Sequence, residues 1–319
     1  MMGTFPDNVT LTEVGPRDGF QFEEKIVPTS LKREIVLRLV EAGFRNIQIT
    51  AFVHPRKVPQ MADAEALTAI LPQIPGVAFN ALALNLTGVE RAHAAGITHI
   101  ETSISASNRH SLNNAGMNAN AALDMGVQMV SLAKQYGMAV RAGIQCVFGS
   151  GYEEAVSVET IIRTAQSLLD AGADMLCLAD TTGMATPVSI CRMLDAVMPV
   201  ADNTPVVLHL HDTRGLGLIN VMTALSCGIT HFDTSMAGMG GCPFIPDAAG
   251  NIATEDTLHL LNSLGIDTGL NTAQIAACSR DMAAFFGKTF PGKIYRLTAD
   301  SHHERSAGDS FKMRPTDMA

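Results

Sequence analysis

The sequence predicts an α/β fold, a (β/α)8 or TIM barrel with a C-terminal helical extension. Three observations predict it: short apolar runs alternate with longer helix-like segments, eight such runs can be counted, and the connections are short. Eight strand–helix units that close on themselves need about 250 residues, and the chain has 319. An open, doubly wound sheet has the same alternation and is the competing prediction.

Eight runs are expected to form the strands, because each is apolar along most of its length and bounded by turn residues. They are "NVTLTEVG" (8–15), "NIQITAFV" (46–53), "VAFNALAL" (77–84), "HIETSIS" (99–105), "AVRAGIQCVF" (139–148), "MLCLAD" (175–180), "PVVLHLH" (205–211) and "HFDTSMAG" (231–238).

Five intervening segments are expected to be helices: 29–44, 85–96, 160–173, 187–198 and 218–228. In the first of them, Thr29 or Ser30 is the expected N-cap, and Gly43 stands where a C-terminal glycine belongs. Several segments end in "AG" before the next strand, which indicates a tight turn in which glycine supplies a left-handed conformation.

The chain is expected to be one domain, 1–319, with the barrel over about 8–270 and the extension over 271–319. The final "ADSHHERSAGDSFKMRPTDMA" is polar, and its composition is typical of a loosely held tail. The sequence contains neither a linker nor a second domain signature.

Composition narrows the class of protein. Hydrophobic residues make up 47% and charged residues 17%, which is typical of a globular chain. The net charge of −9 argues against a nucleic-acid surface. No apolar stretch is long enough to span a bilayer, and the start lacks a signal-peptide pattern. The six scattered cysteines form no C-x-x-C pair, which favours a reducing compartment, so a cytoplasmic location without membrane or nucleic-acid partners is expected.

The run "HLHD" at 209–212 carries the strongest chemical signal. Strand side chains alternate between two faces, so His209 and His211 point the same way and Leu210 points to the other side. In a barrel of this kind the active site forms at the carboxyl ends of the strands, and these imidazoles lie at the end of the seventh. Asp18, after the first strand, could complete three metal ligands, and Asn251 could add an amide oxygen. Two ordinary satisfied histidines are the alternative interpretation.

The stretch "GMGGCPF" follows the eighth strand. It is not a G-x-G-x-x-G motif after the first strand, so dinucleotide binding is disfavoured. Its glycines are typical of a mobile loop at the mouth of the site, and Cys242 lies within it. An inert loop thiol is the alternative.

Several of these segments together resemble the 3-hydroxy-3-methylglutaryl-CoA lyases, metal-dependent barrels related to isopropylmalate synthase. The similarity runs in order from about residue 8 to about residue 275. It is carried by "EVGPRDGFQFE", "TAFVHPRKVPQMAD" (50–63), "LADTTGMATP" (178–187), "HLHDTRGLGLINV" (209–221), "AGMGGCPF" and "GNIATEDTLHLLNSLGIDTG" (250–269).

The resemblance implies a site and a reaction. Asp18, His209, His211 and Asn251 would hold a divalent cation, Mg²⁺ or Mn²⁺, and the catalytic residues would be Arg17, Cys242, Asp180 and Glu255. Gln21, Gln48, Ala51 and His54 would contact an acyl-CoA substrate. The cation would acidify the substrate hydroxyl, a base would remove its proton, and the C2–C3 bond would break to a keto acid and the enolate of acetyl-CoA. Arg17 would stabilise the charge on the thioester oxygen.

Two positions and one short stretch depart from the family pattern. Gln48 stands where the lyases usually have glutamate, Ala51 replaces a serine, and "HPRK" (54–57) replaces "SPKW". An amide can neither take up a proton nor carry the charge that would orient Arg17. The substrate therefore stays open between hydroxymethylglutaryl-CoA and a related thioester such as citramalyl-CoA. A Claisen-condensing acyltransferase of the same superfamily is a further alternative, against which the Cys242 loop argues, and Gln48 gives some weight to a non-catalytic binding barrel. By analogy with relatives, a homodimer or higher homo-oligomer is expected.

Overall fold

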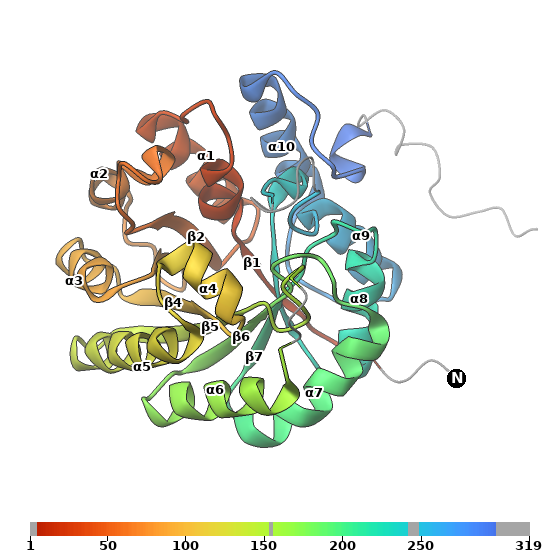
Figure 1. Ribbon diagram of the computed structural model, residues 1–319. Helices are drawn as coiled ribbons and strands as arrows, with labels where there is room; N and C mark the ends of the chain where they lie inside the picture. The colour runs from red at the N-terminus through yellow and green to blue at the C-terminus, as the bar shows by residue number, and fades with distance from the viewer. Residues whose placement is uncertain (1–4, 153–155, 242–248, 298–319) are drawn as a thin grey trace, which may run out of the picture.

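Eight parallel strands close into a barrel in chain order (Figure 1). The computed structural model describes residues 5–152, 156–241 and 249–297. The strands are β1 (Thr10–Glu13), β2 (Asn46–Ala51), β3 (Ala78–Ala83), β4 (His99–Ser105), β5 (Ala139–Gln145), β6 (Met175–Ala179), β7 (Val206–His209) and β8 (His231–Thr234). Because β1 pairs with both β2 and β8, the barrel is confirmed and the open sheet is excluded.

A ring of helices surrounds the strands. They are α1 (Thr29–Glu41), α2 (Ala64–Ile70), α3 (Leu86–Ala94), α4 (Asn108–Ala115), α5 (Ala119–Gln135), α6 (Val158–Asp170), α7 (Pro187–Ala201), α8 (Gly217–Ser226), α9 (Thr254–Ser263) and α10 (Thr272–Phe286). The helices α1, α3, α6, α7 and α8 lie where the sequence predicted helices. No helix in the described ranges is both long and apolar enough to cross a membrane.

The start of α1 corrects one prediction. Neither Thr29 nor Ser30 caps the helix: the N-cap position is Pro28, and no side chain accepts a bond there. The ring of Pro28 fixes an extended entry (φ −58°, ψ 144°), and the Thr29 hydroxyl instead donates to Asp63 at 2.7 Å. The other end is as predicted, since Gly43 has a φ of +109°.

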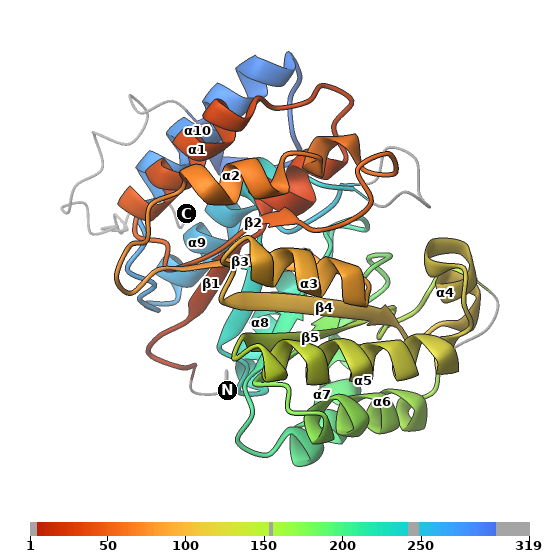
Figure 2. The same ribbon diagram turned by 90° about the vertical axis from the view of Figure 1, so that its left-hand side faces the viewer.

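Three helices were not expected from the sequence, namely α2, α4 and α5. The last two begin at polar N-caps, because Ser107 accepts from the backbone of His110 and Asn118 from that of Ala121. Figure 2 shows α4 standing beyond the tip of β4, at the carboxyl end of the barrel. The helix α10 follows the barrel and lies beside α1 in both views.

Successive strand residues point to opposite sides of the barrel wall: apolar side chains pack outward against the helices, and polar ones point into the barrel. Ile47, Ile100, Val140, Leu208 and Phe232 are almost fully buried and belong to the hydrophobic core. Their neighbours in sequence reach into the barrel, where Arg141 of β5 bonds across the interior to Asp233 of β8 at 2.7 Å. The interior is thus a buried polar layer, which is stable only because its charges are paired.

Candidate active site

Asp18, His209 and His211 converge at the carboxyl end of the barrel. Each offers one ligand atom, and the three atoms lie within 4.8 Å of one another. The Nε2 atoms of the two histidines are 3.2 Å apart, and His209 Nε2 lies 3.9 Å from an oxygen of Asp18. The strand β7 ends at His209, earlier than the predicted run, and His211 continues it as a single bridge to Asn251. The two imidazoles still lie side by side, while Leu210 is fully buried in the core.

Irregular backbone brings the aspartate to the histidines. A single π-helical turn, Gly15–Gly19, follows β1 and carries Asp18, and such turns are frequent at functional sites. Asn251 arrives through a short bridge, in which His211 pairs antiparallel with Asn251 and Ile252 donates to the carbonyl of Leu210 at 3.1 Å. The side chain of Asn251 then donates to Asp18 at 2.7 Å.

The donor set fits a divalent cation. The Oδ1 atom of Asn251 is buried and has no hydrogen-bond partner among the residues that the structure describes. His209 Nδ1 lies 3.1 Å from Asp233, which holds the tautomer whose Nε2 lone pair is free for an ion. A carboxylate, an amide oxygen and two imidazole nitrogens form a mixed oxygen and nitrogen set that suits Mg²⁺ or Mn²⁺.

The charges of the cluster favour this role. Burial and the neighbouring His209 lower the pKa of His211 to about 3, so its imidazole is neutral. Burial tends to raise the pKa of Asp18, but the charges of Arg17, His209 and His211 outweigh it and hold the pKa below its usual value. Burial likewise tends to lower the pKa of His209, but Asp233 and Asp18 raise it above its usual value, so a cation must displace a proton there.

A chain of buried polar contacts connects Arg17 to His209 beneath the cluster. The Arg17 Nε group donates to Gln48, whose amide donates to Glu101 at 2.7 Å. Arg141 donates to Glu101 at 2.9 Å and donates two hydrogen bonds to Asp233, at 2.7 and 2.9 Å. Burial raises the pKa of Asp233, but Arg141 and His209 more than compensate and lower it to about 2. Asp233 is therefore a fixed negative charge.

A cavity of about 430 Å³ opens above the cluster. Its wall includes Arg17, Asp18, Gln21, His209 and His211, and the ammonium-bearing Lys57 also lines it. Gln21 donates to Asp18 at 2.9 Å, so it supports the candidate ligand as well as lining the space. This volume is in the range of small-molecule sites.

Other predicted substrate-contacting residues lie off this wall. Gln48 is fully buried under Arg17, and Ala51 is 1% exposed. His54 is exposed, and its Nδ1 accepts from the backbone of Arg56 at 3.2 Å. Their substrate contacts stay predictions.

Asp180 and Glu255 bind backbone rather than lining the cavity. Asp180 accepts from Met184 and Ala185 at 2.7 and 3.0 Å, and Glu255 accepts from Ala237 at 3.0 Å and from the hydroxyl of Ser279. In each case burial raises the pKa to about 6, although these hydrogen bonds oppose the rise. Both carboxylates anchor the loops that border the site. Cys242 lies outside the described residues.

The sequence reasoning missed Asp233, which orients His209. A signal for it exists in the chain: "GITHIETS" (96–103) and "GITHFDTS" (228–235) are near repeats that place Glu101 and Asp233 at equivalent positions. Both carboxylates pair with Arg141. A second missed residue is Glu13, which is completely buried and accepts from Gly15, Met236 and Thr254. It thereby joins the π-helical turn, the turn after β8 and the start of α9.

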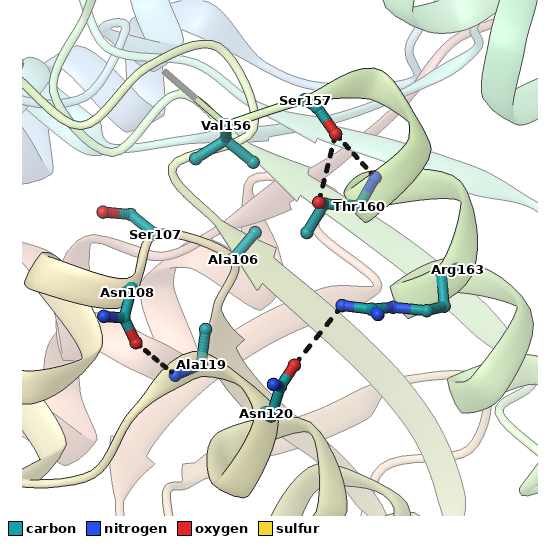
Figure 3. Close-up of a pocket in the computed structure, with 9 residues that line it drawn as sticks. All are labelled: Ala106, Ser107, Asn108, Ala119, Asn120, Val156, Ser157, Thr160 and Arg163. Atoms are coloured by element: carbon teal, nitrogen blue, oxygen red, sulfur yellow. Dashed lines mark hydrogen bonds between the residues drawn. The ribbon is translucent and has the colours of Figure 1, made fainter. Parts of the chain in front are cut away.

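A second hollow of about 270 Å³ lies between the starts of α4, α5 and α6 (Figure 3). Its polar groups are engaged with one another: Asn108 accepts from the backbone of Ala119 at 3.1 Å, and Arg163 donates to Asn120 at 3.3 Å. Its lining contains none of the candidate metal ligands, so we place the chemistry in the larger cavity.

Comparison with known proteins agrees with this geometry. A sequence profile described as HMGL-like matches residues 8–282. The mitochondrial hydroxymethylglutaryl-CoA lyase of Bos taurus is 38% identical over 93% of this chain and 91% of its own. The crystal structure of the HMG-CoA lyase of Bacillus subtilis has a TM-score of 0.88 at 35% identity, covering 92% of this chain and 98% of that one. An HMG-CoA lyase structure from Acinetobacter baumannii, in complex with coenzyme A and 3-methylmalate, has a TM-score of 0.88 at 31% identity, covering 97% and 100%.

Proposed function

Because the chain belongs to the HMGL-like family, we propose that it is a carbon–carbon lyase that cleaves a 3-hydroxy-3-methyl acyl-CoA to acetyl-CoA and a keto acid. The observation that carries the proposal is the meeting of Asp18, His209 and His211 beside a cavity whose wall also bears Arg17. A cation site next to a fixed positive charge is what the cleavage of a hydroxy thioester requires.

We assign Asp18, His209, His211 and the amide oxygen of Asn251 to a divalent cation, Mg²⁺ or Mn²⁺. When bound, such an ion supplies Lewis acidity that lowers the pKa of the substrate hydroxyl. The contribution of the chain is to hold the donors: Asp233 orients His209, and Gln21 and Asn251 orient Asp18.

Arg17 supplies the second electrostatic element. It lines the cavity, is 7% exposed, and is held by Gln48 and Asp18. Breaking the C2–C3 bond leaves negative charge on the thioester oxygen of the acetyl-CoA enolate. A guanidinium already fixed in a dry site stabilises that charge without reorganising. The carboxylates of Asp180 and Glu255 would keep the bordering loops in place, and Cys242 is proposed to take part in protonating the enolate.

The identity of the acyl group is the open part of the proposal. Hydroxymethylglutaryl-CoA is the reference substrate, because the relatives carry that name. The structure from Acinetobacter baumannii holds 3-methylmalate, another methyl-substituted hydroxy diacid, and Gln48 alters the support of Arg17. A related thioester such as citramalyl-CoA therefore belongs in the same test.

The test is a panel of 3-hydroxy acyl-CoA thioesters incubated with Mg²⁺ or Mn²⁺, with acetyl-CoA and the keto acid quantified. Wild-type protein should cleave at least one member, His211→Ala should abolish cleavage, and His259→Ala on the exposed side of α9 should leave it unchanged. Failure to cleave any thioester while still binding one would favour a binding protein, and synthesis from acetyl-CoA that outpaces cleavage would favour a condensing enzyme. We also propose a homo-oligomer and a cytoplasmic location, which sedimentation and fractionation test.

A further inference from the structure

Gln48 lies between the guanidinium of Arg17 and the carboxylate of Glu101. This arrangement shows how Arg17 is held although position 48 carries no charge. Resting on the proposed lyase function, we propose that Glu101 is the positioning residue for Arg17 and acts on it through Gln48. The negative charge that supports Arg17 thus lies one side chain beyond Gln48, on β4.

The hydrogen bonds along this path have a single direction. The Arg17 Nε group can only donate, and the Glu101 carboxylate can only accept. Gln48 must therefore turn Oε1 toward Arg17 and Nε2 toward Glu101, as observed, with the second contact at 2.7 Å. An amide between two neutral groups could flip, whereas Glu101 fixes Gln48 in the one orientation that holds Arg17.

The carboxylate is itself held firmly. Glu101 is 6% exposed, and the same oxygen that accepts from Gln48 accepts from Arg141 Nε at 2.9 Å and from its Nη2. The register places Glu101 directly opposite Arg141 on the adjacent strand. Gly143, two residues further along β5, leaves room for it, since a Cβ there would lie 3.0 Å from Glu101 Oε1.

Arg17 needs this second support because its other partner has another task. Its Nη1 group bonds to Asp18, which we assign to the cation. A bound cation draws on the same carboxylate charge, so Asp18 alone is a weak anchor for the guanidinium. The path through Gln48 and Glu101 holds Arg17 from the opposite side and does not involve a candidate ligand.

The test is a charge transposition. Glu101→Gln removes the charge, and Gln48→Glu places two carboxylates at the present 2.7 Å contact, where they repel each other. Each single variant should lower kcat by about 10–100-fold, with KM and the Kd for Mn²⁺ changed less than about threefold. The double variant Gln48→Glu with Glu101→Gln removes the carboxylate repulsion but only partly replaces the present contacts, because one amide atom cannot both donate to position 48 and accept from Arg141. Its kcat should therefore exceed that of Gln48→Glu alone and stay below that of wild type. The exposed control Glu90→Gln should change nothing.

A second variant and an NMR signal test the same role of Glu101 independently. Glu101→Asp keeps the charge beside Arg141 but is too short to reach Gln48, so it should lose kcat even if Glu101→Gln folds poorly. The ¹⁵N NMR signal of Arg17 Nε, assigned with Arg17→Lys, should shift in Glu101→Gln and move part of the way back in the double variant. This readout needs no turnover, so it judges the role of Glu101 even if wild-type protein cleaves no thioester and the lyase proposal fails. An unchanged kcat and Nε signal in Glu101→Gln, or losses that simply add in the double variant, would overturn the proposal.

Discussion

Asp233→Asn is the sharpest probe of the candidate cation site, because it removes a charge behind the site and leaves every candidate ligand in the sequence unchanged. Asp233 is 1% exposed, lies 3.1 Å from His209 Nδ1, and receives two bonds from Arg141. The asparagine has nearly the same shape. It loses the charge that favours the His209 tautomer needed for a metal, and it turns an amide donor toward either Arg141 or His209.

The expected loss follows from these contacts. Removing the partner of a metal-binding histidine typically weakens metal affinity by about 10–100-fold, or roughly 1.4–2.8 kcal/mol. Asp233 also raises the pKa of His209, in opposition to burial, so in wild type a proton competes with the ion below that pKa. In Asp233→Asn this charge no longer raises the pKa of His209, so a proton competes less with the ion. The deficit in affinity should therefore be larger at pH 8 than at pH 6.

The assay is calorimetric titration with Mn²⁺ at both pH values, on the wild type, Asp233→Asn and a control. Asp170→Asn on α6 is a matched control, because Asp170 is exposed and accepts a hydrogen bond from Gln166, one turn earlier on the same helix. A folded Asp233→Asn protein that binds Mn²⁺ within about twofold of wild type at pH 8 would refute the role assigned to Asp233.

Three other outcomes are expected. Burial raises the pKa of Glu13 to about 8, although hydrogen bonds from Met236, Thr254 and Gly15 oppose the rise. The protonated Glu13 side chain therefore contributes its full share to the stability of the fold below pH 4.5, and this share is lost as the pH rises through about 8. Thermal melts should accordingly show wild type losing Tm relative to Glu13→Gln between about pH 5 and 8.5, and parallel curves would contradict this. Gly143→Ala should lower the free energy of unfolding by about 1–3 kcal/mol, because the new Cβ would lie 2.9 Å from Ser103 Oγ. Chemical denaturation measures this change. Gly137→Ala is not a suitable control, because the φ of Gly137 is +72° and an alanine there would be strained. Adding Mn²⁺ at about 100 times its Kd to chelator-treated protein should stabilise it by about 2.7 kcal/mol, and His211→Ala should show no such gain.

Local patterns predicted much of this molecule. The eight apolar runs all contain strands, and the period of two correctly placed His209 and His211 on one face. The polar N-caps of α4 and α5 are as clear in the sequence as those of the other helices. Both helices lie in the one long connection between β4 and β5, where the alternation of one strand with one helix does not predict them. The cap expected at Thr29 failed because Pro28 imposed the entry and Asp63 took the hydroxyl.

The sequence by itself determined which residues face the barrel interior and which chemistry they bring, because periodicity and residue type are local properties. Only the tertiary structure decided which of them meet. Closure of the barrel brings Arg141 to Asp233, 92 residues apart, and Asp18 to Asn251, 233 residues apart. It also buries Gln48 against Glu101 rather than in the cavity wall. Such pairs depend on strand order, register and barrel radius, which are properties of the whole chain and are written in no single segment.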